Sequence, residues 1–116
     1  MAGSLTLSTL SDGTNSTNAT DVIRGSARAW ANFNGSAATI RASYNVSSVT
    51  RAGTGQYTIN YTNALTDANY SITGTVNSDS RTLSIGSLST TSSAMRSTNT
   101  AGAFDDVTMV TIVVFR

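Results

Sequence analysis

The stretch Gln56-Tyr-Thr-Ile-Asn-Tyr-Thr62 decides the fold class, because its side chains alternate between apolar and polar at every step. The apolar residues share one face of an extended chain and the polar residues share the other: Tyr57, Ile59 and Tyr61 against Thr58, Asn60 and Thr62. This period of two is typical of a strand with one buried face. The preceding Gly53-Thr-Gly55 predicts the turn of a hairpin.

Similar runs recur on both sides of this stretch, about every 8–12 residues. Asn34-Gly35 between two β-favouring runs predicts a hairpin turn with φ > 0 at both positions. No segment of ten or more residues has a helical period with caps, and the chain is rich in threonine. We therefore expect an all-β antiparallel sandwich, or a jelly-roll-like single domain, with strands over 27–33, 36–44, 56–62, 70–76, 82–88 and 107–115.

The chain of 116 residues has the length of one domain. Residues 1–25 are its most polar and glycine-dotted part, and Leu5, Leu7 and Leu10 are prominent among the few apolar residues there. We interpret this segment as an extended N-terminal arm and residues 26–116 as the β-sandwich module. An ordinary first strand followed by a loop explains the same segment equally well.

The last run, from Val107 to Phe115, is apolar on both faces, so both faces are expected to be buried. In so small a domain, one face can fill the core and the other can contact another subunit. We assign Val110, Ile112 and Val114 to the subunit interface on this basis. A central strand buried within one sandwich is an equally good interpretation.

The composition removes most catalytic and metal-binding chemistry. The chain contains no lysine, glutamate, histidine, cysteine or proline, while serine, threonine and asparagine fill 48 of 116 positions. Nucleophilic triads lack a histidine base and zinc sites lack histidine and cysteine ligands, so we expect no enzyme, no catalytic residue and no cofactor. Asp105 and Asp106 are adjacent and would point to opposite faces of a strand, which rules out an acid–base pair.

Charge and hydropathy also limit the possible partners. A net charge of +1 predicts no nucleic-acid partner, and no run approaches the roughly 18 apolar residues of a membrane span. The N-terminus lacks the pattern of a signal peptide. Oxygen-bearing residues recur every third position at Asp12, Asn15, Asn18 and Asp21, but they lack a calcium-loop pattern. We therefore expect no metal site and interpret them as part of a solvated arm.

Aromatic side chains form the last group of candidates: Trp30, Phe33, Tyr44, Tyr57, Tyr61 and Tyr70. They could form a platform on which sugars stack. In a core this poor in leucine and isoleucine, however, aromatic residues are the main resource for burial, so we place them in the core or at a subunit interface.

Several segments together are similar to a known family. Ser26-Ala-Arg-Ala-Trp-Ala-Asn-Phe-Asn-Gly35 resembles the "AKAW-x-NFNG" opening of a widespread bacteriophage virion module. The similarity continues through Ile40–Ser48, Gly53–Tyr61 and Asp67-Ala-Asn-Tyr70, and the ending Val114-Phe-Arg116 also matches. Residues 74–103 fall outside the resemblance. The resemblance implies a virion setting without enzymatic activity, and such β modules on phage particles are commonly trimers.

The preferred interpretation is a homotrimeric capsid decoration, or cement, protein. It would lie on the virion surface after assembly in the bacterial host cytoplasm, bridging capsid subunits and anchored by Leu5, Leu7 and Leu10. The alternative is a tail-fibre or spike component that binds host surface glycan through exposed residues such as Tyr44. A chain without lysine, glutamate or proline lacks the residues that usually protect sheet edges from pairing with other chains. In either case this favours a component of a larger assembly, in which neighbours cover the edges.

Overall fold

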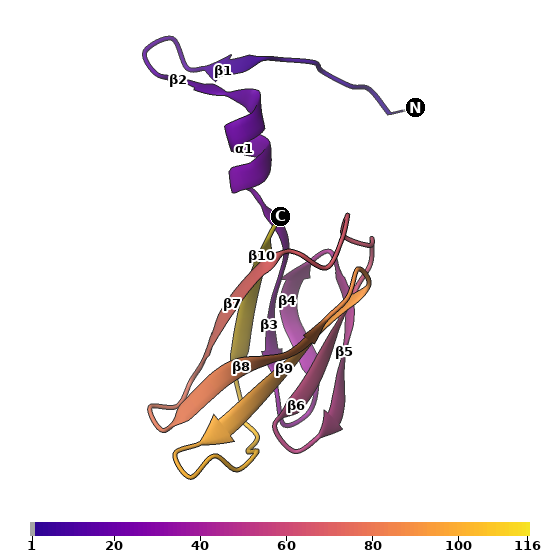
Figure 1. Ribbon diagram of the computed structural model, residues 1–116, viewed down its shortest axis with the longest axis vertical. Coiled ribbons are helices and arrows are strands. Elements are labelled where there is room, and N and C mark those ends of the chain that lie inside the picture. The colour runs from indigo at the N-terminus through magenta and orange to yellow at the C-terminus, as the bar shows by residue number, and fades with distance from the viewer. Residues whose placement is uncertain (1) are drawn as a thin grey trace.

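The computed structural model describes residues 2–116, in which ten strands and one helix are found. Two four-stranded antiparallel sheets pack face to face, and the N-terminal arm stands beyond one end of them (Figure 1). The expected all-β sandwich is confirmed. The strands of the sandwich are β3 (Ala27–Asn34), β4 (Thr39–Tyr44), β5 (Val46–Gly53), β6 (Gln56–Tyr61), β7 (Ser71–Val76), β8 (Arg81–Leu88), β9 (Ser92–Asn99) and β10 (Val110–Phe115).

The first sheet has the order β4-β3-β10-β7 and the second has the order β5-β6-β9-β8. The strand expected from the alternating stretch is β6, which buries Tyr57, Ile59 and Tyr61 as predicted. Two strands of the sandwich were not predicted, β5 and β9. In β9 the buried positions include Ser93 and Ser97, so its sequence shows little contrast between the faces. In β5 a bulge after Val46 breaks the period of two.

The predicted two-residue turn at Asn34-Gly35 is wrong. Four residues separate the paired Asn34 and Thr39, and the residue with positive φ is Ala38. The side-chain oxygen of Asn34 accepts hydrogen bonds from the backbone N–H groups of Ser36 and Ala37, which shapes the longer turn. Gly35 is needed for close approach, since a Cβ there would lie 2.5 Å from the Tyr57 hydroxyl oxygen.

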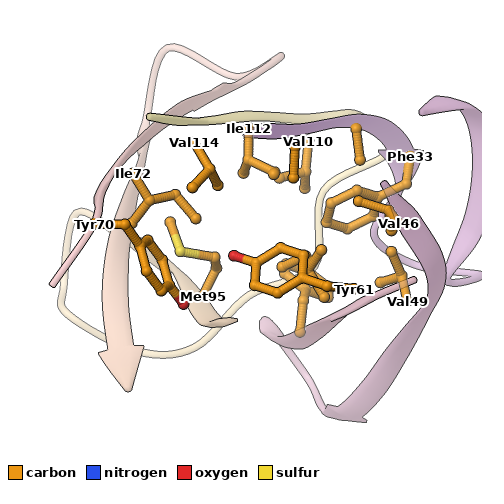
Figure 2. Close-up of a cluster of buried hydrophobic side chains, with 14 of the residues drawn as sticks. Phe33, Val46, Val49, Tyr61, Tyr70, Ile72, Met95, Val110, Ile112 and Val114 are labelled. Carbon is orange, nitrogen blue, oxygen red and sulfur yellow. The ribbon is translucent and has the colours of Figure 1, made fainter. Parts of the chain in front are cut away.

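The core lies between the two sheets, and β10 contributes its most buried side chains. Val110, Ile112 and Val114 are 0%, 3% and 0% exposed, and Figure 2 shows them projecting toward Tyr61 and Met95 of the other sheet. Their assignment to a subunit interface is therefore wrong, because the single chain already buries them. The alternative interpretation, a central strand buried within one sandwich, describes this face of β10.

The strand β10 also begins three residues later than expected. The N–H of Val107 donates to the Tyr57 hydroxyl, its carbonyl accepts from Ser36, and the N–H of Met109 donates to the side chain of Asn77. These backbone groups bond to a side chain or a loop in place of a neighbouring strand, so regular pairing starts only at Val110.

The N-terminal arm is not extended throughout. It contains the hairpin of β1 (Thr9–Ser11) and β2 (Ser16–Asn18), followed by the helix α1 (Ala19–Gly25), which leads into β3. At seven residues, α1 is too short to display a helical period over ten or more residues, so it was not predicted. The arm stands at the end of the sandwich where the chain also terminates, and it does not run along an edge strand (Figure 1). We call this the arm end and the opposite one the distal end.

Candidate functional site

The arm presents a cluster of apolar side chains to solvent. Leu5, Leu7, Leu10, Val22 and Ile23 are 82%, 43%, 49%, 38% and 55% exposed. Together with Ala19 they line a hollow of about 220 Å³, and we call these six residues the arm cluster. The helical residues Ala19, Val22 and Ile23 share one face of α1 because they are spaced three and four residues apart. The leucines of the predicted anchor thus lie with three residues of α1 that had not been assigned to the anchor.

The arm cannot bury these residues by itself. The helix α1 contains no buried residue, and each strand of the arm hairpin is three residues long. Isolated helices below about 12–15 residues and isolated two-stranded hairpins are marginal in water. An arm of this kind gains most from a partner that covers its apolar side chains, so the arm cluster is a candidate contact surface.

A second candidate is a polar cup at the arm end, where β3, the β4–β5 junction, the loop 62–70 and the C-terminus come together. Its volume is about 410 Å³ and its lining includes Arg28, Tyr44, Asn63 and Arg116. The Nε of Arg28 donates to the carbonyl oxygen of Arg116 at 3.0 Å. Tyr44 is 57% exposed, so an aromatic ring, guanidinium groups and an amide border one hollow.

An ion pair fixes one wall of this cup. The Nε and Nη2 atoms of Arg116 donate to the carboxylate of Asp67 at 2.9 and 2.6 Å. These bonds, together with the backbone N–H of Asn69, hold the pKa of Asp67 below its ordinary value. The charge of Arg116 is therefore largely matched, while Arg28 forms no ion pair with an aspartate among residues 2–116. The cup can donate hydrogen bonds but contains no acid–base pair.

The two adjacent aspartates hold the distal end together and do not form a pair. Asp105 forms an ion pair with Arg81 of β8, and Asp106 forms one with Arg51 of β5. Asp106 also accepts hydrogen bonds from the N–H of Gly55 at 2.8 Å and from the hydroxyl of Tyr57 at 3.3 Å. The segment that leads to β10 is thus tied to both edges of the second sheet.

Arg51, followed by the Gly55 amide, holds the pKa of Asp106 below its ordinary value although partial burial opposes this. The ionised carboxylate therefore stabilises the fold above about pH 4, and this contribution is lost as the pH falls through the lower folded-state pKa. We expect Asp106→Asn to lower the free energy of unfolding at pH 7 by about 2 kcal/mol. The variant should also show a flatter dependence of stability on pH between about 5 and 2 than the unmodified chain.

Denaturant unfolding across this pH range measures both effects. Asp79→Asn is the matched control, since Asp79 is exposed and has no ion-pair partner among the described residues. Equal unfolding curves for the two variants would contradict the role of Asp106.

The six aromatic candidates divide between the core and the surface. Phe33, Tyr57, Tyr61 and Tyr70 are buried in the core, with the Tyr61 and Tyr70 hydroxyls both bonded to the buried Ser93. Trp30 and Tyr44 are exposed instead. The Asp12 carboxylate accepts hydrogen bonds from the backbone N–H groups of Thr14 and Asn15, which stabilises the turn of the arm hairpin.

Among residues 2–116, no three metal-ligating side chains of the His, Cys, Asp or Glu type are gathered into one group. No helix in the same range is long and apolar enough to cross a membrane. No protein-family model, curated protein or solved structure matches this chain.

Proposed function

We propose that this protein is a structural component of a bacteriophage particle, acting as a homotrimeric capsid decoration protein that bridges capsid subunits. The observation that supports this most is the arm cluster, whose apolar side chains project from the sandwich without cover. A protein that works by attachment needs such a surface, whereas acid–base catalysis most often uses histidine, lysine, cysteine or glutamate, and this composition contains none of them.

Attachment would use both the backbone and the side chains of the arm. Residues 2–7 precede β1 and have no strand partner, so their N–H and C=O groups can pair with an edge strand of a capsid protein. Leu5 and Leu7 are two residues apart and would point to the same side of such an added strand. Three arms in a trimer would bind together, which strengthens contacts that are modest individually.

Binding to capsids that lack the protein tests the anchor. Burying one leucine contributes about 1.5–3 kcal/mol, so we expect Leu7→Asp to weaken binding by at least about tenfold. The neighbouring Thr6→Asp adds the same charge without removing an apolar side chain, and it is expected to bind nearly as the unmodified chain does. Because the arm cluster is uncharged, occupancy measured by co-sedimentation should change little between low and high salt.

Equal binding by Leu7→Asp and the unmodified chain would count against the anchor. Antibody labelling of the particles then tests the location. We expect label on the capsid, at positions of local threefold symmetry, and label confined to the tail would overturn the decoration role.

The polar cup favours a second candidate, a tail-fibre or spike component that binds host surface glycan. The exposed ring of Tyr44 can stack on a sugar, while Arg28 and Asn63 can donate hydrogen bonds to its oxygens. Binding to a glycan array that is lost in Tyr44→Ala would favour this candidate. The cup lies at the arm end, so such a protein would present its arm end toward the host.

A further inference from the structure

The outward face of the first sheet contains two directly paired rows of side chains. The first row runs Tyr44, Trp30, Val113, Thr73 across β4, β3, β10 and β7. The second row, one step toward the distal end, runs Ala42, Asn32, Thr111, Thr75. Every member of both rows is uncharged, and two arginines border them. Arg28 lies in β3 two residues before Trp30, and Arg41 donates to the side-chain oxygen of Asn32 at 3.3 Å and to the carbonyl oxygen of Thr108 at 2.7 Å. We call these eight residues the paired rows.

The first row places large apolar side chains in solvent. Tyr44 and Trp30 are 57% and 40% exposed, and Phe115, the next outward residue of β10 toward the arm end, is 37% exposed. Aromatic residues are enriched and charged residues are depleted at the centre of protein interfaces, whereas arginine is common around them. The outward face of the second sheet differs, since its central strands present Thr58, Asn60, Ala94 and Arg96.

The same face also contains a depression beside this aromatic ridge. A hollow of about 230 Å³ lies where β7 and β10 meet, lined by Thr73, Gly74, Thr75, Thr111, Ile112 and Val113. A hydrogen bond of 2.9 Å between the Thr75 and Thr111 hydroxyls satisfies these groups within the chain. The floor of the hollow is thus uncharged and already bonded, and it can receive an apolar or aromatic side chain without leaving a donor unpaired.

We propose that the paired rows form the contact between copies of this chain, with Trp30 at its centre. An uncharged face is best matched by another uncharged face, and this face itself supplies both a ridge and a hollow into which the ridge of a neighbour can pack. The number of copies, three, rests on the proposed function. The proposal that the copies contact one another through the paired rows does not. With copies arranged around an axis along the sandwich, all arms emerge at one end, where they can bind one partner surface.

The single tryptophan of the chain makes this contact directly measurable. Trp30 is 40% exposed in one chain and becomes buried when copies associate. We expect its fluorescence emission to shift to shorter wavelength, and acrylamide quenching to fall, as the concentration of the full chain rises from about 0.1 to 100 µM. Over the same range, sedimentation should show the mass increase from 12.0 kDa toward three times that value.

Two outward substitutions separate this contact from the fold. Val113→Asp places a charge in the first row and should shift the association midpoint by at least about tenfold, because an unpaired charge in an apolar contact is costly. Ala94→Asp is the matched control on the central strand β9 of the other sheet, and it should associate as the unmodified chain does. If Val113→Asp fails to fold by circular dichroism, Tyr44→Arg on the edge strand β4 gives the same test.

A folded chain that stays monomeric at about 100 µM, with unchanged Trp30 emission, would overturn the proposal. Association that survives both row substitutions, or that is lost equally in Ala94→Asp, would overturn it as well. These results do not depend on whether the arm cluster attaches the protein to capsids. Capsid binding that is lost in Leu7→Asp would still support the decoration role, and association through Trp30 would stand if antibodies placed the protein elsewhere.

Discussion

Ile112→Asp is expected to prevent the sandwich from folding. Ile112 is 3% exposed at the centre of β10, and the buried residues of the described core include no positively charged side chain that could neutralise a carboxylate. Removing the apolar side chain costs about 2–5 kcal/mol, and burying an unpaired charge adds several more. This total is similar to the whole stability of a typical domain, about 5–15 kcal/mol. Circular dichroism and tryptophan fluorescence should show an unfolded or aggregated chain.

Val113→Asp is the control for this experiment, because it adds the same charge one residue later on the outward face of β10. That variant is expected to stay folded. A folded Ile112→Asp monomer would mean that the inward face of β10 is not core. Ile112→Asp that folds but only loses its oligomeric state would restore the subunit interface first assigned to this face.

Gly55→Ala is expected to lower the free energy of unfolding by about 2–5 kcal/mol. Two causes add up here. Gly55 has φ +63°, which costs a residue with a Cβ about 1–2 kcal/mol. A Cβ would also lie 2.5 Å from the carbonyl oxygen of Ser97 and 2.6 Å from the backbone nitrogen of Asp105. Both are backbone atoms, so the distal end must shift and the bonds that tie Asp106 to β5 weaken.

Gly102→Ala separates these two causes. Gly102 lies in a distal loop with φ +81°, but no atom lies within 4 Å of the position of a Cβ there. The Gly102→Ala variant should therefore lose only the conformational part of the free energy of unfolding, about 1–2 kcal/mol. Urea unfolding of both variants measures the difference. Equal losses would show that the close approach at Gly55 contributes nothing.

The sequence indicates the fold wherever the two faces of a strand differ in polarity. The stretch that became β6 alternates between tyrosine or isoleucine and polar residues, and its strand and buried face are as predicted. Prediction failed where this contrast disappears. The core positions of β9 include two serines. The hydroxyl of Ser97 is buried without a hydrogen-bond partner among the described residues, whereas Ser93 bonds to two tyrosine hydroxyls, supplied by β6 and by the residue before β7. Such bonds join distant segments and leave no local pattern.

The candidate surfaces were predicted less completely than the fold. Leu5, Leu7 and Leu10 could be singled out because they are apolar residues in a polar segment. Val22 and Ile23 belong to the same surface only because α1 turns them toward the leucines, and so short a helix has no reliable signature. The two faces of β10 were both recognised as apolar, but only the packing of the sheets determines which of them is inside.

The position of the two chain ends determines how this sandwich can be joined to other segments. The base of the arm and Arg116 lie at the same end, linked through Arg28 (Figure 1). A segment fused after Arg116 would therefore leave beside the arm, and the loops over 77–80 and 100–103 would remain unobstructed at the opposite end. A peptide inserted in one of these exposed loops would be displayed away from whatever the arm binds, so the molecule could serve as a scaffold for presenting foreign peptides.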